Sequence, residues 1–218
     1  MIVDFTVSNF RSFRDMQTLS MNVEGPRLRH PSNFSLVDDE RLAVLRSAGI
    51  FGANASGKTN ILRALAAIQW IIVSSAGRKE TQAIPPYEPF RLATKHAERP
   101  VTFEIEFVVP TGARYRYEVS FVRQRIVEER LISFARRSRA VVFERFEGDT
   151  WETIKFGGTL KGGTRKFPFF HNAAYLSRAG NDASSPDFIR EIYKYFESLS
   201  YIVAGLETRL NNVTEEVS

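Results

Sequence analysis

The stretch Gly-Ala-Asn-Ala-Ser-Gly-Lys-Thr at residues 52–59 restricts the fold more than any other part of the sequence. It fits the pattern G-x-x-x-x-G-K-[ST], whose glycines let the backbone turn so that successive N–H groups converge on phosphate oxygens. Lys58 places an ammonium group against the β- and γ-phosphates, and the Thr59 hydroxyl suits one coordination site of Mg²⁺. We therefore predict a nucleotide site with Lys58 as its catalytic side chain and Thr59 as its magnesium ligand. The predicted site comprises Gly52, Ala53, Asn54, Ala55, Ser56, Gly57, Lys58, Thr59 and Asn60.

The residues on either side of this loop predict a strand before it and a helix after it. Residues 42–45 and 48–51 are mostly apolar and are expected to form a short strand that leads into the loop. Ile61, Leu65 and Ile68 recur at helical spacing, which predicts a helix over 58–75. The positive end of that helix would face the same phosphates.

Composition limits the class of protein. The 218 residues are 43% hydrophobic and 12% aromatic, which is typical of a folded protein with one large domain or two small ones. The chain has no cysteine, which excludes disulfides and thiol nucleophiles and suits a reducing cytoplasm. The amino terminus does not resemble a signal peptide, and we expect no membrane-spanning stretch. A net charge of +5 permits nucleic-acid contact without arguing strongly for it.

Alternation of apolar and polar residues predicts an antiparallel sheet. Residues 3–8 read as a strand, residues 19–23 as its return strand, and residues 27–39 as a loop. Residues 101–109 and 115–121 alternate on either side of a Pro-Thr-Gly turn and predict a hairpin. Further strands are expected over 126–134, 141–146 and 151–156, giving a β-meander with one apolar and one charged face.

The last third of the chain is expected to return to the core. Residues 155–166 are rich in glycine and basic residues and predict a loop, and residues 188–196 have the spacing of an amphipathic helix. Residues 201–203 could add one more strand.

Two separated segments resemble a known class of ATPase. Asn9 to Phe13, followed by Gly52 to Asn60, resembles the opening of an ABC-type head of the SMC/RecF/OLD group. The segments 7–21, 49–62, 103–107 and 115–131 resemble the RloA-like AAA ATPases of bacteria. This resemblance implies an α/β P-loop NTPase of ABC-head type with an inserted antiparallel β-meander. It also implies that Arg11 and Ser12 contact the nucleotide, and that Asn54 approaches the γ-phosphate.

The same resemblance implies partners and a cellular setting. The cofactors would be ATP and Mg²⁺, and the heads would form a homodimer or a higher oligomer. Such ATPases often lie in anti-phage or restriction-linked operons beside nucleases, so we expect an effector nuclease or another defence-operon partner. DNA or RNA is a further expected partner, and a membrane is not.

The sequence lacks two motifs of a complete ATPase head, the Walker B strand and the signature motif. Leu36 to Glu40 superficially resembles a Walker B strand, but its apolar part is too short and it precedes the loop. Leu176 to Gly180 lacks the paired glycines of a signature motif and is expected to be a strand end and loop. We therefore expect residues 1–218 to be an amino-terminal lobe, with a P-loop core over 1–80, the meander over 81–170 and a returning helix and strand over 171–218.

Other polar groups leave alternatives open. Arginines 136, 137 and 139, with 123, 125, 130 and 145, could bind nucleic-acid phosphates or form a solvated face balanced by glutamates 128, 129 and 144. The basic residues 155, 161, 165 and 166 raise the same choice. The three histidines are not spaced from each other or from carboxylates as metal ligands are. Either Gln82 or Gln124 could be the Q-loop glutamine, which would contact Mg²⁺ and water.

Three functions compete at this level. The first is an ATPase that controls a partner, and the second is a nucleic-acid-binding scaffold in which ATP sets dimerisation. The third is a nucleotide kinase or GTPase, which is disfavoured because the sequence has no N-K-x-D motif and no arginine-bearing lid after the helix.

Overall fold

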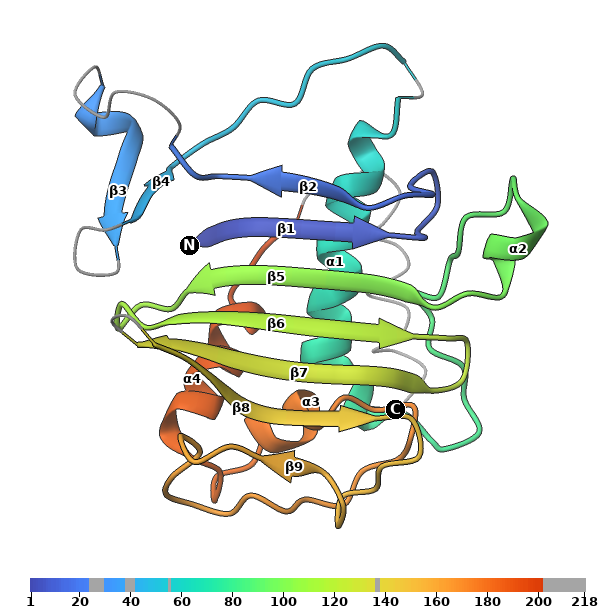
Figure 1. Cartoon of the computed structure of the whole chain (residues 1–218), viewed down its shortest axis with the longest axis vertical. Coiled ribbons are helices and arrows are strands. Elements are labelled where there is room, and N and C mark those ends of the chain that lie inside the picture. The colour runs from blue at the N-terminus through green and yellow to red at the C-terminus, as the bar shows by residue number, and fades with distance from the viewer. Residues whose placement is uncertain (24–29, 38–41, 55, 136–137, 202–218) are drawn as a thin grey trace.

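The main element of the fold is a seven-stranded antiparallel sheet (Figure 1). The computed structural model describes residues 1–23, 30–37, 42–54, 56–135 and 138–201. The strand order is β2-β1-β5-β6-β7-β8-β9, and each neighbouring pair is antiparallel. The strands of this sheet are β1 (Ile2–Ser8), β2 (Gln17–Ser20), β5 (Val101–Val108), β6 (Arg114–Phe121), β7 (Ile126–Ala135), β8 (Ser138–Phe146) and β9 (Lys155–Phe156).

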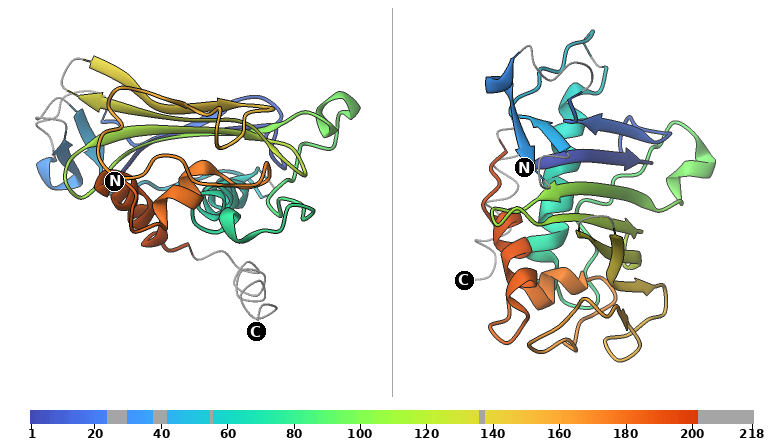
Figure 2. Two further views of the ribbon diagram at one scale, coloured as in Figure 1. Left: turned by 90° about the horizontal axis from the view of Figure 1, so that it is seen from below. Right: turned by 60° about the vertical axis from the view of Figure 1, so that its left-hand side comes forward.

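Three helices cover one face of this sheet and leave the other face open (Figure 2). They are α1 (Lys58–Ser74), α3 (Tyr175–Gly180) and α4 (Asp187–Glu197). A 3-10 turn, η2 (Ser75–Gly77), continues α1, and a short helix, α2 (Thr94–Ala97), lies beyond the sheet. A separate two-stranded sheet pairs β3 (Phe34–Val37) with β4 (Leu42–Leu45), after the turn η1 (Pro31–Asn33).

The core lies between the covered face and α1. Val3, Phe5 and Val7 of β1 are fully buried, as the alternation predicts. On α1 the predicted apolar stripe is buried in the same interior as Phe5 and Val7, and it comprises Ile61, Leu65, Ile68 and Ile72. Val3 packs in a separate small cluster with Val44 and Val108. Each such side chain contributes about 1.5–3 kcal/mol relative to exposure. The structure therefore confirms the predicted helix over 58–75 and the predicted burial of alternate strand residues.

The predicted hairpin and meander are also present. Val101 pairs with Phe121 and Val108 with Arg114, which fixes the β5–β6 register around the Pro-Thr-Gly turn. On the open face, Glu106 accepts hydrogen bonds from Arg114 and Arg116. A sheet with one apolar and one charged face is the result. The meander continues directly from β1 through β5, so the early strands and the meander form one sheet.

Four local predictions were wrong. Of the strand expected to lead into the phosphate loop, only 42–45 forms, and it pairs with β3 outside the main sheet. Residues 47–51 have no regular structure, because none of the described strands lies alongside to satisfy their backbone. The loop expected over 27–39 contains η1 and β3. The strand expected over 151–156 is reduced to β9, and the strand end expected at 176–180 is the helix α3.

The helix Lys58–Gly77 has the length and hydropathy of a membrane span, with a mean hydropathy of 1.3. The sequence-based expectation that no stretch qualifies was therefore too strict. In the folded chain much of this apolar surface is buried under the sheet, as in the core helix of a folded domain.

Candidate functional site

The phosphate loop ends at the amino terminus of α1, where backbone donors are free. Gly57 is the N-cap of α1 and has φ +92°, a left-handed conformation that glycine adopts without strain. In the part of the chain that the structure describes, no side chain caps this end of the helix. The first N–H groups of a helix have no intrahelical acceptor, so they can bind an anion. The described part of the loop thus has the backbone that a phosphate cradle needs.

Lys58 folds back over the loop. Its Nζ donates to the carbonyl oxygens of Gly52, at 2.8 Å, and Ala53, at 2.6 Å. Ser56 Oγ lies 3.4 Å from the same ammonium. All three partners are neutral, and a charge-assisted bond to a phosphate oxygen is roughly twice as strong as a neutral one. A phosphate group entering the loop would therefore compete well for this cation.

A turn between β1 and β2 packs against the start of α1. Phe10 and Phe13 exchange backbone hydrogen bonds of 2.9 and 2.8 Å, which leaves Arg11 and Ser12 at the tip of the turn. Asn60 Nδ2 donates to Ser12 Oγ over 2.8 Å. A Cβ on Gly57 would lie only 2.9 Å from the same Oγ, so the close approach requires glycine. The structure thus brings Ser12, Gly57 and Asn60 together.

Arg11 points to a different partner. Its guanidinium pairs with the carboxylate of Glu88, and its backbone N–H donates to the Glu88 carbonyl over 2.8 Å. It also lies over the Phe10 ring, with Cζ 5.9 Å from the ring centroid. Among the described residues, Arg11 makes no hydrogen bond or ion pair with the phosphate loop. Sequence similarity placed Arg11 at the nucleotide, whereas in this structure Glu88 holds it.

The other predicted site residues lie open to solvent. Gly52, Ala53, Asn54, Ser56 and Thr59 are exposed, and the Thr59 hydroxyl has no hydrogen bond to the residues that the structure describes. Ala55 lies outside the described residues. An exposed, unpartnered hydroxyl at the first turn of α1 fits the expected magnesium ligand.

Two of the described arginines of the suggested basic patch are held by glutamates. Arg145 is buried with Glu129, and Arg130 is paired with Glu118, Glu128 and Glu144. Residues 136 and 137 lie outside the described residues. Glu129 was expected on a solvated face, and this was wrong, because it is fully buried. Its position in the strand alternation was the available signal, since it is two residues before the buried Leu131.

Glu129 organises a polar cluster in the core that sequence reasoning missed. Its carboxylate accepts from Tyr117 Oη at 3.0 Å, from Arg145 Nε at 2.8 Å, and from the backbone N–H groups of Tyr175 and Leu176. The last two are at the start of α3, where a negative charge is favoured. Burial and the neighbouring carboxylate raise the pKa of Tyr117 well above 10.0.

The remaining candidates contact other groups. Gln82 Oε1 accepts from the Lys79 backbone N–H at 2.9 Å, and neither Gln82 nor Gln124 contacts the phosphate loop among the described residues. Lys155, Lys161, Arg165 and Lys166 are exposed. In the ranges the structure describes, no histidine joins a cluster able to hold a metal.

A glycine-bounded loop, a lysine at the first position of the following core helix and a free hydroxyl next to it define a P-loop nucleotide-binding domain. Its fold is α/β with an antiparallel main sheet. The chain belongs to the family described as "AAA domain, putative AbiEii toxin, Type IV TA system", whose model matches residues 47–215. No curated protein matches the chain. The family match begins just before the loop and implies nucleotide and Mg²⁺ binding there.

Proposed function

We propose that the chain binds ATP with Mg²⁺ at residues 52–60 and serves as one lobe of an ATPase head of ABC/SMC type. The observation that carries the proposal is the Lys58 ammonium, which lies over the loop carbonyls at the uncapped start of α1. A fixed cation and free N–H groups at one point are suited to a polyphosphate.

In this proposal each residue has a distinct task. The loop amides and Lys58 hold the β- and γ-phosphates, and the Thr59 hydroxyl holds the metal. Bound Mg²⁺ would offset the charge that develops on the transferred phosphoryl group. The hydrogen bond between Ser12 and Asn60 holds the Arg11–Ser12 turn against Gly57. The turn therefore forms a fixed side of the phosphate site.

Hydrolysis would need a second lobe. Among the described residues, the partners of Lys58 are two carbonyl oxygens and a hydroxyl, with no carboxylate beside the phosphate loop to activate water. We therefore propose that the glutamate that activates water comes from another segment. The exposed side chains of Ile50, at 43%, and Phe51, at 93%, support this view, because they lie beside the loop with unpaired backbone. A strand packed there would cover both.

The nucleotide state would then control how two heads associate and how a partner effector acts. The family description, which names a toxin and a type IV toxin–antitoxin system, supports a role in bacterial defence, and DNA maintenance is the related setting. A second candidate is a nucleic-acid-binding scaffold with little turnover. The exposed basic residues at 155–166 favour it.

Calorimetric titration of ATP with Mg²⁺ tests the binding step. Lys58→Ala should weaken binding by about tenfold to a hundredfold, because about 1.5–3 kcal/mol is lost with a hydrogen bond to a charged group. Lys79→Ala is the matched control, since Lys79 is an exposed lysine in the turn after η2. Equal binding by the wild type and Lys58→Ala would contradict the assignment.

Turnover separates the two candidates. ATP hydrolysis by the complete protein, measured with and without DNA, should disappear in Lys58→Ala. Equal DNA binding by both proteins with no turnover in either would favour the scaffold.

A further inference from the structure

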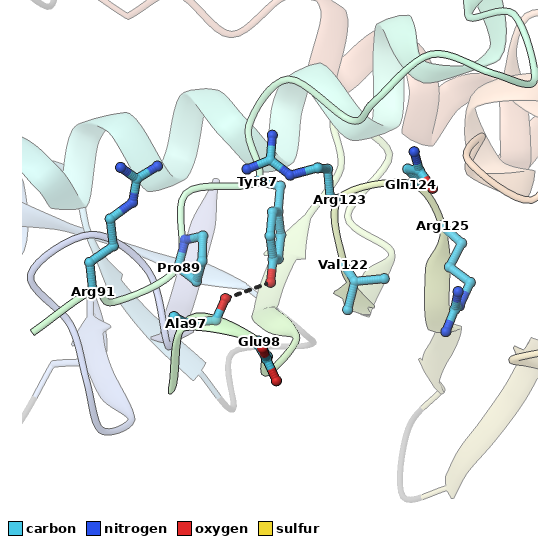
Figure 3. Close-up of a pocket in the computed structure, with 9 residues that line it drawn as sticks. All are labelled: Tyr87, Pro89, Arg91, Ala97, Glu98, Val122, Arg123, Gln124 and Arg125. Carbon is cyan, nitrogen blue, oxygen red and sulfur yellow. Dashed lines mark hydrogen bonds between the residues drawn. The ribbon is translucent and has the colours of Figure 1, made fainter. Parts of the chain in front are cut away.

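A second cleft lies beside the β6–β7 turn, lined by residues that the nucleotide loop does not use (Figure 3). Its volume is about 650 Å³, within the range of small-molecule sites. An adjoining cavity of about 350 Å³ shares Pro89 and Arg91 with it. The larger cleft is lined by Tyr87, Pro89, Arg91, Ala97, Glu98, Val122, Arg123, Gln124 and Arg125.

Two arginines in this cleft are not paired with a carboxylate. Arg125 pairs with Glu147 over 2.7 Å, and Arg11 of the adjoining cavity pairs with Glu88. Arg91 and Arg123, by contrast, have no ion pair among the described residues. Arg123 instead lies over the Tyr87 ring, with Cζ 5.8 Å from the centroid. In Figure 3 the Arg123 guanidinium extends over Tyr87 toward the side on which Arg91 lies. A guanidinium group can donate two parallel hydrogen bonds to a phosphate.

Hydrogen bonds hold one wall of this cleft in place. The Tyr87 hydroxyl donates to the carbonyl oxygens of Ala97 and Arg99, each at 3.2 Å. The buried Asn9 amide donates to the carbonyls of His96, Arg99 and Pro100 at 2.9, 3.0 and 3.2 Å. These hydrogen bonds hold Tyr87 and residues 96–100 in place, so this wall of the cleft is formed before any ligand enters.

The charge pattern favours a small ligand over a strand of nucleic acid. A strand is held by many phosphate contacts, whereas this cleft has two unpaired arginines and a carboxylate, Glu98, in its wall. Pro89, Ala97 and Val122 surround Tyr87 with apolar surface, which suits a flat ring. A ligand with one phosphate group and one flat ring would match these features, and a nucleoside monophosphate has both.

We infer that this cleft is a second ligand site, which takes a nucleoside monophosphate or a molecule of the same build. Arg91 and Arg123 hold the phosphate, and the ring lies against the apolar surface around Tyr87. The site is distinct from the P-loop, since none of the described residues in 52–60 lines either cavity.

Adenosine monophosphate is the probe, titrated by calorimetry without Mg²⁺ into the whole chain in a Lys58→Ala background. Lys58→Ala weakens the P-loop and leaves Arg91 and Arg123 in place, so failure of the proposed ATP site and failure of this site give different results. Saturable binding is expected, with the same affinity in the wild type. Arg91→Gln with Arg123→Gln should weaken it by about tenfold or more.

Two further variants show whether a loss is specific. Arg123→Lys keeps the positive charge but loses the planar guanidinium that can donate two parallel hydrogen bonds, so it should retain part of the affinity for adenosine monophosphate. Arg190→Gln removes an arginine on α4 that is paired with Asp187, far in sequence from the cleft, and should change nothing. Thermal melting confirms that each variant is folded.

Three outcomes would overturn the inference. They are no saturable binding, equal binding by the double variant, and binding of a short single-stranded oligonucleotide in place of the mononucleotide. Competition of the mononucleotide by inorganic phosphate would support the role of the two arginines.

Discussion

The side-chain amide of Asn60 donates a 2.8 Å hydrogen bond to the hydroxyl of Ser12, a residue 48 positions earlier in the chain. This bond connects the first turn of α1 to the tip of the β1–β2 turn. It lies next to Gly57, where the helix begins, so the turn acts as a wall of the phosphate loop. The predictions below follow from this contact and from the core that supports it.

Replacing Ser12 with alanine should weaken ATP binding without unfolding the chain. The change removes the acceptor of the Asn60 amide, and a hydrogen bond of this kind contributes about 1 kcal/mol, or roughly fivefold in affinity. Ser20→Ala on β2 is the control, because Ser20 Oγ accepts only a local bond from the Asn22 N–H. Calorimetry and thermal melting measure the two effects. Unchanged affinity in Ser12→Ala would show that the contact does not organise the site.

Replacing Gly57 with alanine should abolish ATP binding and destabilise the fold. An L-residue in the left-handed region costs about 1–2 kcal/mol, and the new Cβ would also press on Ser12 Oγ. Gly148→Ala is a close control, since Gly148 has φ +91° and nothing within 4 Å of its Cβ position. Urea unfolding should show a larger loss for Gly57→Ala. Retained ATP binding in that variant would contradict the prediction.

Removing the buried charge of Glu129 should destabilise the chain strongly. Glu129→Ala leaves the Arg145 guanidinium buried without its partner, and breaking such a pair costs about 3–5 kcal/mol. Glu147→Ala breaks the half-exposed pair with Arg125 and should cost about 1 kcal/mol or less. Urea unfolding compares the two variants. Similar decreases in the free energy of unfolding of the two variants would mean that burial does not determine how much the Glu129–Arg145 pair stabilises the fold.

Stability should fall in alkaline solution because of buried tyrosines. Burial raises the pKa of Tyr117, Tyr175 and Tyr195 above the ordinary value of 10.0. Above about pH 10 these tyrosines lose a proton in the unfolded chain but keep it in the fold, so the free energy of unfolding decreases as pH rises.

Urea midpoints over a series of alkaline pH values measure this slope, and tyrosinate absorbance reports ionisation. Tyr195→Phe should make the slope shallower, because Tyr195 would no longer titrate. Ionisation of all tyrosines in the folded chain near pH 10 would contradict the prediction.

Local patterns were enough to predict much of this molecule. The residues of the loop, the helix after it and the β5–β6 hairpin each follow from spacing within a short stretch of sequence. Such spacing reports which side chains of one element share a face. Glu129 was misplaced because its charge was weighed above its place in the strand alternation, two residues before the buried Leu131.

The strand expected at 48–51 failed for a related reason. Its residues are apolar, but a strand needs a neighbour to take its hydrogen bonds, and sequence composition does not show one. The pairing of Arg11 with Glu88 was equally out of reach, because 77 residues separate them and similarity alone pointed to the nucleotide.

By itself, then, the sequence determined the phosphate loop with its lysine and hydroxyl, the core helix that follows, and the antiparallel meander, since each depends on contacts between near neighbours in the chain. Only the tertiary structure decided that Ser12 lies against Gly57, that Glu129 and Arg145 are buried together, and that a second arginine-lined cleft forms at the β6–β7 turn. These features depend on how α1 and the distant strands pack, and packing joins residues whose separation in the sequence carries no periodic signal.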